Sequence, residues 1–261
     1  QYSPDGKEVA FFEDRAALRI INLKSKEIRT VLDGKYVYSY SDGDIAFEWS
    51  PDSKWLLSTY IGNGGWNNQD IALVKADGKE VHNLTNSGYS DSNGKWVLDG
   101  KAMLFQSDRA GYRSHGSWGA EDDAYIMFFD LDAYNRFNMS KEEIELADAN
   151  KDEKEKKEDE KKEEAKKKAD EKQKKTGKKK KEKVKPLELD IENCRDRIVR
   201  LTANSSHMGD AVLSKDGDKL YYQAAFEDDY DLWQHDLKDG STKLVMKGVG
   251  QGNLQTDKDV K

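Results

Sequence analysis

The motif SPDGKEVAF at residues 3–11 decides the fold, because the chain repeats it. A near copy, SPDSKWLLS, occupies residues 50–58, and weaker copies occupy residues 98–105 and 214–222. The first three copies are spaced 47 residues apart, and the fourth lies one such period plus 70 residues further on. A fixed period of this length predicts a repeat array such as a propeller, and not a fold with a single core.

Three of the copies are followed by a second hairpin, in which two apolar strands flank a polar turn. These second hairpins occupy residues 18–32, 70–85 and 231–246. Their Val, Ile, Leu, Tyr and Trp residues suit a pleated, half-buried surface, and the Asp-Gly or Lys-Ser turns tolerate a positive φ. Two hairpins give four strands in about 45 residues, the size of a propeller blade. We therefore predict an all-β fold, a β-propeller fragment of about four four-stranded blades.

The third repeat contains an insertion. The strand that begins at Asp123 should have a partner within a few residues, but the matching strand comes only at residues 197–202. Between them, Ser140 and Glu143 have the spacing of a capping box, which predicts a short helix. Residues 151–185 contain 18 Lys, 11 Asp or Glu and no aromatic residue, so burial cannot offset the entropy of ordering them. We predict a charged insertion in blade three, partly helical or disordered.

The repeats and the insertion together predict the domain boundaries. We expect a partial blade at residues 1–43, a blade at 44–86, a blade at 87–139 plus 187–205, the charged Lys/Glu-rich insertion at 140–186, a blade at 206–249, and the start of a further blade at 250–261.

The repeated turns have a structural interpretation. Asp5, Asp52, Asp99 and Asp216 are expected to accept hydrogen bonds from local backbone amides, and the glycines that follow, Gly6, Gly100 and Gly217, are expected to adopt a positive φ. Ser53 stands where the second turn should have its glycine. A somewhat different turn is therefore expected there.

Charge is distributed unevenly along the chain. Residues 151–185 carry a net charge of +7 while the whole chain carries −7, which leaves −14 on the remainder. A basic arm suggests nucleic-acid binding. Its lysines, however, are interleaved with carboxylates, it lacks Arg and aromatic residues for stacking, and an acidic body repels phosphate. We predict no nucleic-acid partner, and no membrane span either, because no apolar run approaches the roughly 20 residues that a bilayer requires.

Two features of the sequence carry a family resemblance. The SPDGKEVAF and SPDSKWLLS repeats are similar to the Pro-Asp-type repeats of TolB and of tricorn-like proteases. The run from Leu84 to Glu143, followed by the Lys/Glu-rich insertion and then by residues 196–233, resembles the second propeller of tricorn-like serine peptidases of Bacteroidetes-type bacteria. The resemblance covers essentially the whole chain.

The resemblance implies a parent protein in which propellers precede a helical region, a PDZ-like domain and a catalytic serine-peptidase domain. It places the catalytic residues downstream of Lys261. The implied role of the propeller is to guide or filter peptide substrates, or to scaffold the catalytic domain. The implied partners are peptide or protein substrates and the downstream PDZ-like and catalytic domains, with a homo-oligomer left open. The implied location is the periplasm or the cell exterior, with a signal peptide outside these residues, and the cytoplasm is the alternative.

Two other functions stay open from the sequence. One is a TolB-like interaction propeller without protease activity, and the other is the propeller of a prolyl-oligopeptidase-like enzyme. The gene sequence beyond Lys261 discriminates them. A tricorn-like parent requires a PDZ-like domain and a serine-peptidase domain there, whereas a prolyl-oligopeptidase relative requires a Gly-x-Ser-x-Gly elbow.

The sequence contains no recognisable catalytic or metal-binding motif. The four histidines are scattered over three repeats, without a Gly-x-Ser-x-Gly elbow or a His-Glu-x-x-His pair, so no catalytic residue is predicted. Residues 148–159 imitate a calcium loop, but Glu153 replaces the required glycine and Asp159 the bidentate glutamate. We predict neither a metal nor a cofactor.

Two Gly-rich loops, at residues 62–68 and 107–119, are the candidate binding surfaces. Both mix polar groups with aromatic rings, which suits contacts to peptide backbones or carboxylates. In the alternative interpretation, the tryptophans cap their blades and Arg109 pairs with a neighbouring Asp. The predicted peptide or partner contacts are Trp66, Asn67, Arg109, Arg113, His115 and Trp118.

Overall fold

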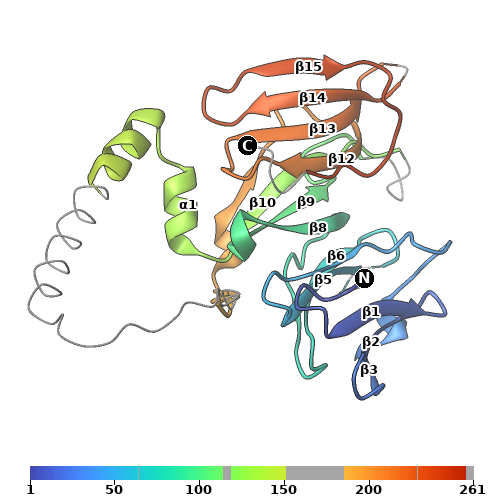
Figure 1. Cartoon of the computed structure of the whole chain (residues 1–261). Coiled ribbons are helices and arrows are strands. Elements are labelled where there is room, and N and C mark those ends of the chain that lie inside the picture. Colours follow the sequence, from blue (N-terminus) through green and yellow to red (C-terminus); the bar gives the residue numbers. More distant parts are fainter. Residues whose placement is uncertain (64, 114–118, 151–184, 228, 257–261) are drawn as a thin grey trace, which may run out of the picture. The chain divides into compact units, whose positions relative to one another are not determined.

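The computed structural model describes residues 1–63, 65–113, 119–150, 185–227 and 229–256. The chain divides into two compact units. The first comprises Gln1–Tyr134 and Lys185–Lys261, and the second comprises Asn135–Val184. The first unit consists mainly of β-strands (Figure 1).

Four antiparallel sheets follow one another along the first unit, and they are successive blades of a β-propeller fragment (Figure 1). In each sheet the spatial order of the strands equals their order in the chain. The first sheet contains β1 (Glu8–Glu13), β2 (Ala17–Asn22) and β3 (Ile28–Leu32), and the second contains β4 (Phe47–Trp49), β5 (Trp55–Tyr60), β6 (Asp70–Lys75) and β7 (Val81–Asn83). The third contains β8 (Asp91–Val97), β9 (Ala102–Ser107), β10 (Asp123–Phe128) and β11 (Ile198–Arg200), and the fourth contains β12 (His207–Leu213), β13 (Lys219–Ala225), β14 (Asp231–Asp236) and β15 (Thr242–Met246).

The first sheet has three named strands and a short inner pairing. Tyr2 forms an isolated antiparallel bridge with Val9, and Ala10 exchanges backbone hydrogen bonds with Gln1 at 2.7 and 2.9 Å. Residues 1 and 2 therefore occupy the position that β4, β8 and β12 occupy in the other sheets.

Neighbouring sheets pack face to face through alternate residues of their central strands. Leu56 of β5 belongs to the apolar core between the first and second sheets, whereas the next residue, Leu57, belongs to the core between the second and third. Both side chains are fully buried. Because successive side chains of a strand point to opposite faces, a central strand between two sheets is apolar on both faces and reads as a continuous run. All six residues of β9 and of β10 are buried for this reason.

Three of the four repeated turns share one hydrogen-bonding pattern. Ser3, Ser50 and Ser214 each donate from Oγ to the aspartate two residues later, at 2.8, 2.7 and 2.5 Å. Each of these aspartates also accepts a hydrogen bond from a backbone amide, that of Lys7, Lys54 or Asp218 respectively. The sequence prediction is confirmed for these three turns.

The expectation of a different second turn is wrong. Ser53 adopts φ +61°, close to the +71° and +81° of Gly6 and Gly217, and its amide donates to the Ser50 carbonyl oxygen as the glycine amides do in their own turns. The turn that differs is the third, where no described group donates a hydrogen bond to the Asp99 side chain. Its serine position is taken by Val97, which has no hydroxyl to hold the carboxylate, and Leu98 and Asp99 both adopt a positive φ.

The four turns are linked in sequence, the second to the third through Leu187. The amide of Asp5 donates to Ser53 Oγ at 3.1 Å. The amide of Leu187 donates to Asp52 Oδ2 at 2.9 Å, and its side chain covers Gly100 so closely that a Cβ there would lie 2.7 Å from it. Leu98 covers Gly217 in a similar way. These contacts join the ends of all four sheets.

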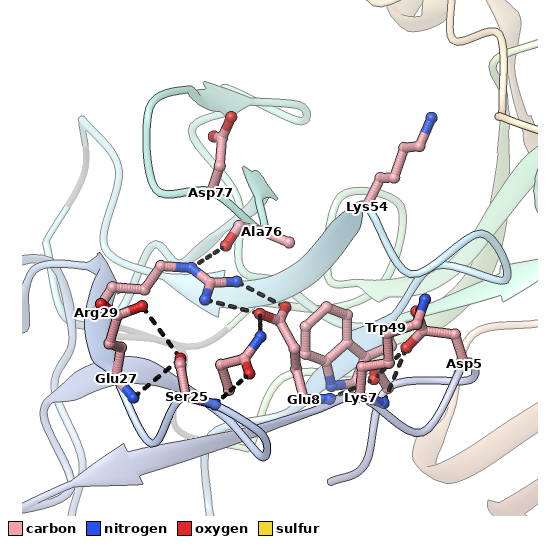
Figure 2. A network of polar contacts seen from close by, with 12 residues as sticks. Asp5, Lys7, Glu8, Ser25, Glu27, Arg29, Trp49, Lys54, Ala76 and Asp77 are labelled. Atoms are coloured by element: carbon pink, nitrogen blue, oxygen red, sulfur yellow. Dashed lines mark hydrogen bonds and ion pairs between the residues drawn. The ribbon is translucent and has the colours of Figure 1, made fainter.

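A second set of contacts ties the first sheet to the second (Figure 2). Arg29 of β3 donates two hydrogen bonds to the Glu8 carboxylate, at 2.7 and 2.8 Å, and a third from Nε to the Ala76 carbonyl oxygen at 2.7 Å. The guanidinium is 33% exposed and the carboxylate 18%. This partly buried, bidentate pair therefore bridges two blades.

The outer strand of the third sheet comes after the insertion. Strand β11 pairs with β10 in antiparallel register, with η4 (Cys194–Arg197) directly before it. The segment that leads to β11, residues 185–197, is called the returning limb. It also contacts the second sheet, because Arg195 donates to the Leu84 and Asn83 carbonyl oxygens at 2.9 and 2.5 Å.

The insertion begins with helix α1 (Leu131–Phe137), which the sequence analysis missed. The predicted capping box is confirmed: Ser140 N donates to Glu143 Oε2 at 2.8 Å, and Glu143 N donates to Ser140 Oγ at 3.2 Å. Residues 141–150 are helical. Residues 151–184 lie outside the described part of the chain. Among the described residues, every helix is too short or too polar to cross a lipid bilayer.

Candidate functional site

The two predicted binding loops lie at the same end of their sheets, because both connect the second strand of a sheet to the third. One runs from the end of β5 to the start of β6, and the other from the end of β9 to the start of β10. In the first loop Trp66 is 45% exposed and Asn67 is half-buried. His115 and Trp118 of the second loop lie outside the described residues.

Arg109 is held in place by contacts within its own sheet. Its guanidinium donates to Asp91 Oδ1 at 2.7 Å and to Ser107 Oγ at 2.8 Å. It also lies over the rings of Phe105 and Tyr125, with 5.3 and 5.0 Å between the guanidinium carbon and the ring centroids. Because Asp91 is completely buried, the arginine neutralises a charge that would otherwise be costly to bury.

Arg113 brings the two loops together. It forms an ion pair with the buried Asp108 at 3.0 Å, donates to the Gly88 carbonyl oxygen at 2.8 Å and contacts the side chain of Asn68 in the other loop. Its guanidinium carbon lies 5.5 Å from the Tyr89 ring centroid. Both arginines thus stabilise the loop end of the molecule, and their contact with a ligand stays a prediction.

A cavity of about 1160 Å³ lies along the innermost strands of three sheets. Strands β4, β8 and β12 contribute to its walls. The lining extends from Asn93 and Gly209, near the loop end, to Asp99 and Asp216 in the repeated turns. It therefore follows about five residues of β8 and of β12, from Asn93 to Val97 and from Gly209 to Leu213. Five strand residues span roughly 17 Å, which matches an extended peptide of similar length.

Three charged residues of the inner strands link the neighbouring sheets that line this cavity. Lys95 of β8 donates to both carboxylate oxygens of Asp210 in β12, at 2.6 and 2.7 Å, and to the Ala211 carbonyl oxygen at 3.1 Å. Glu48 of β4 accepts a hydrogen bond from the Trp96 backbone amide, at 2.6 Å from Oε2. Glu48, Lys95 and Asp210 were not among the predicted site residues, because no motif marks them and they lie far apart in the chain.

Part of the cavity wall is a stretch of irregular backbone near the end of the described chain. Residues 253–256 line the cavity and adopt no regular secondary structure. The Leu254 amide donates to Asp210 Oδ2 at 2.7 Å, and the Gly252 amide just before it donates to Gln223 Oε1 at 3.1 Å. Asp210 therefore binds polypeptide backbone in the cavity lining, and Gln223 does so beside the lining residue Gly209.

His235, Asp148 and Cys194, which have reactive side chains, lie in surroundings that suggest a structural role. His235 Nδ1 forms a hydrogen bond with Thr242 Oγ1 at 2.7 Å, and Asp148 of the calcium-like stretch pairs with Arg136 at 2.8 Å. Cys194 is buried, and burial raises the pKa of its thiol. Within the described ranges, no three His, Cys, Asp or Glu side chains are grouped so that they could hold a metal ion.

Comparison with known proteins gives structural likeness without close sequence similarity. The sequence matches no protein-family profile and no curated protein sequence. A putative TolB from Agrobacterium tumefaciens is 14% identical, with a TM-score of 0.50 over 95% of this chain and 60% of that one. TolB from Acinetobacter baumannii is 19% identical, with a TM-score of 0.49 over 94% and 42%. The β-propeller domain of the Trilobed protease from Pyrococcus furiosus is 15% identical, with a TM-score of 0.48 over 98% and 60%.

The chain thus covers 42% to 60% of the length of these three proteins. At 14% identity, the likeness to the Agrobacterium tumefaciens protein supports the propeller fold and nothing more specific.

Proposed function

We propose that this chain is a non-catalytic β-propeller segment of a tricorn-like serine peptidase, and that it binds peptide substrates along its inner strands and guides them towards the catalytic domain. The observation that carries the proposal is the cavity along β4, β8 and β12, in which Asp210 already binds the Leu254 backbone amide of an irregular segment that lines it. Backbone recognition of this kind is independent of sequence, as a guide for many peptides requires.

The loop end is proposed as the entrance to this path. Trp66 is exposed there, and Arg113 ties its loop to the loop of the third sheet. In this proposal the predicted contact residues Trp66, Asn67, Arg109, Arg113, His115 and Trp118 meet the peptide before it reaches the inner strands.

A bulky side chain inside the cavity tests the binding proposal. Ala46 lines the cavity and is half-buried, so Ala46→Trp should occlude it. Fluorescence anisotropy with a pool of unstructured 12-residue peptides, labelled at the C-terminus, should show affinity reduced about tenfold, equivalent to about 1.4 kcal/mol. Lys79→Trp, at an exposed position outside the cavity, is the matched control and should leave affinity unchanged. The proposal is contradicted if the original chain binds no peptide, or if Ala46→Trp binds peptides with unchanged affinity.

The guiding role needs the full-length enzyme. There, Ala46→Trp should lower kcat/KM for 12-residue peptides and leave short chromogenic substrates unaffected, because these do not need the path. An equal loss for both kinds of substrate indicates a scaffolding role instead.

A TolB-like interaction propeller is the second candidate, and one observation favours it. All five residues of β15 are exposed, including Leu244, Val245 and Met246 at 38%, 45% and 59%. An exposed apolar edge strand is a template for pairing with another protein. The gene sequence beyond Lys261 decides between the two, since only a tricorn-like parent continues into a PDZ-like domain and a serine-peptidase domain.

A further inference from the structure

Glu48 occupies an unusual position in the cavity along β4, β8 and β12. It is the central residue of β4 and lines the cavity. Its Oε2 accepts the Trp96 amide at 2.6 Å, whereas its Oε1 accepts no hydrogen bond from any residue that the structure describes. One oxygen thus anchors the side chain to the neighbouring sheet, and the other remains available to a ligand.

The nearest cation does not neutralise this carboxylate. Burial raises the pKa of Glu48 by more than the hydrogen bond from the Trp96 amide and the charge of Lys95 together lower it, so the net shift is upward. The three donors of the Lys95 ammonium are all used by Asp210 and Ala211. Glu48 is therefore a partly buried acid without a bonded cation.

The whole cavity carries an excess of negative charge. Its lining includes five side-chain carboxylates, three lysine ammonium groups and the ammonium group of Gln1. The carboxylates are Asp44, Glu48, Asp99, Asp210 and Asp216, and the lysines are Lys95, Lys215 and Lys219. Low-dielectric walls focus such a field and raise the local concentration of cations. A cation that reached Glu48 would form a charge-assisted hydrogen bond with a carboxylate that has already lost much of its hydration.

From these observations we infer that Glu48 is the docking point for a positively charged group of the bound peptide, either its N-terminal amine or a lysine or arginine side chain. This inference rests on the proposed peptide-binding function and adds a preference for cationic peptides. Glu48 selects the charge, while Asp210 binds a backbone amide at another point of the cavity lining.

Three short peptides separate charge recognition from general peptide binding. They are pentaalanine amide with a free amine, its N-acetylated form, and N-acetylated Ala-Ala-Lys-Ala-Ala amide. Titrations followed by NMR on the 261-residue chain at pH 7 should show at least one cationic peptide binding about tenfold more tightly than the neutral one. Preference for the free amine identifies the N-terminus as the ligand group, and preference for the lysine peptide identifies the side chain.

Two variants test whether Glu48 is the cause. Glu48→Gln keeps an oxygen to accept the Trp96 amide and removes the charge, so the preference should fall to within twofold. Glu192→Gln removes the same charge from an exposed position outside the cavity and should keep the preference. If both variants keep it, or if the original chain binds neutral and cationic peptides equally, the inference is overturned while the proposed function survives. If none of the three peptides binds, both are overturned.

Discussion

At the scale of the residue, aspartates recur in two roles. The aspartates of the repeated turns accept hydrogen bonds from local backbone amides. The aspartates that begin the third strand of a sheet accept hydrogen bonds from residues that follow its fourth strand. Asp70 accepts hydrogen bonds from Thr85 Oγ1 at 3.0 Å and from the Ser87 amide at 2.9 Å. Asp123 accepts from Thr202 Oγ1 at 2.5 Å. In each of these two sheets, the threonine of the closing Leu-Thr pair therefore donates a hydrogen bond to a buried carboxylate.

The positive φ of the turn glycines predicts the effect of adding a side chain. Gly6 has φ +71°, and a Cβ there would meet nothing within 4 Å, so Gly6→Ala changes backbone strain alone. We expect the free energy of unfolding to fall by about 1 kcal/mol, measured by urea denaturation. Gly88→Ala is the control, because that glycine also faces open space but has no positive φ. Equal effects of the two substitutions would contradict the strain argument.

Asp122 predicts a pH dependence of stability. Burial, together with the nearby Asp108 and Asp123, raises the pKa of Asp122 to about 7. The folded state thus holds this proton more tightly than the unfolded state, whose pKa is about 3.9. Its contribution to stability is fully present below pH 3.9 and is lost as the pH rises through 7.

Asp122→Asn removes the titrating group and should raise the free energy of unfolding at pH 8 by roughly 1–3 kcal/mol, with a smaller gain at pH 5. Guanidinium chloride denaturation at the two pH values checks this. Asp123→Asn should instead destabilise at pH 8, because Asp123 accepts hydrogen bonds from Arg200, Thr202 and Ser205. If Asp122→Asn raises the free energy of unfolding equally at pH 5 and pH 8, titration of Asp122 is not the cause.

At the scale of the element, the sheets are joined both by apolar faces and by polar bridges. The faces, such as that of Leu56 and Leu57, bury alternate residues against the two neighbours. The bridges lie at the edges: Arg29 reaches from the first sheet to Ala76 of the second, and Lys95 from the third to Asp210 of the fourth. The faces supply stability and the bridges fix how neighbouring sheets are placed.

The Arg29 bridge predicts a difference between buried and exposed ion pairs. Arg29→Ala removes three hydrogen bonds and leaves the Glu8 carboxylate, 18% exposed, without its cation. We expect the free energy of unfolding to fall by about 2 kcal/mol. Lys7→Ala breaks the ion pair between Lys7 and Asp5, whose side chains are 75% and 38% exposed. It should cause no measurable change in the free energy of unfolding. Thermal unfolding followed by circular dichroism measures both, and equal losses would contradict this interpretation.

The sequence predicts the sheets better than the cavity. Turns such as Ser3-Pro4-Asp5-Gly6 and the apolar runs behind them are local signals, so the repeats can be read without a structure. Helix α1 was missed because Leu131–Phe137 contains only seven residues and no capping box. Glu48 and Lys95 lie 47 residues apart, and Asp210 lies 115 residues beyond Lys95. Only the stacking of blades brings them together, and no local pattern encodes it.

At the scale of the whole molecule, the chain consists of a β-sheet unit and a separate inserted unit. The two limbs of the insertion meet at the third sheet, where the Asp190 amide donates to the Phe129 carbonyl oxygen at 3.1 Å. The returning limb is tied to the sheets by Leu187, which contacts Asp52, and by Arg195, which contacts Leu84. Both residues follow the inserted unit in the chain and do not belong to it.

Removal of the inserted unit should therefore leave the sheets intact. We expect replacement of residues 135–184 by a short Gly-Ser linker to change the melting temperature by less than about 4 °C, because lengthening or shortening a surface loop changes its closure entropy only slightly. Differential scanning calorimetry measures the change. Leu187→Asp, which disrupts the contact with Gly100 in the retained limb, should lower the melting temperature by more. A deletion variant that fails to fold would show that the sheets depend on the inserted unit.

The late arrival of β11 has a consequence for biosynthesis. Sheets built from consecutive strands can form as soon as they leave the ribosome, since their contacts are local. The third sheet cannot, because β10 ends at Phe128 and β11 begins only at Ile198. At about 5–20 residues per second, the edge of β10 waits roughly 4 to 14 seconds for its partner. During that interval the nascent chain exposes an unpaired apolar edge, the kind of surface that molecular chaperones shield.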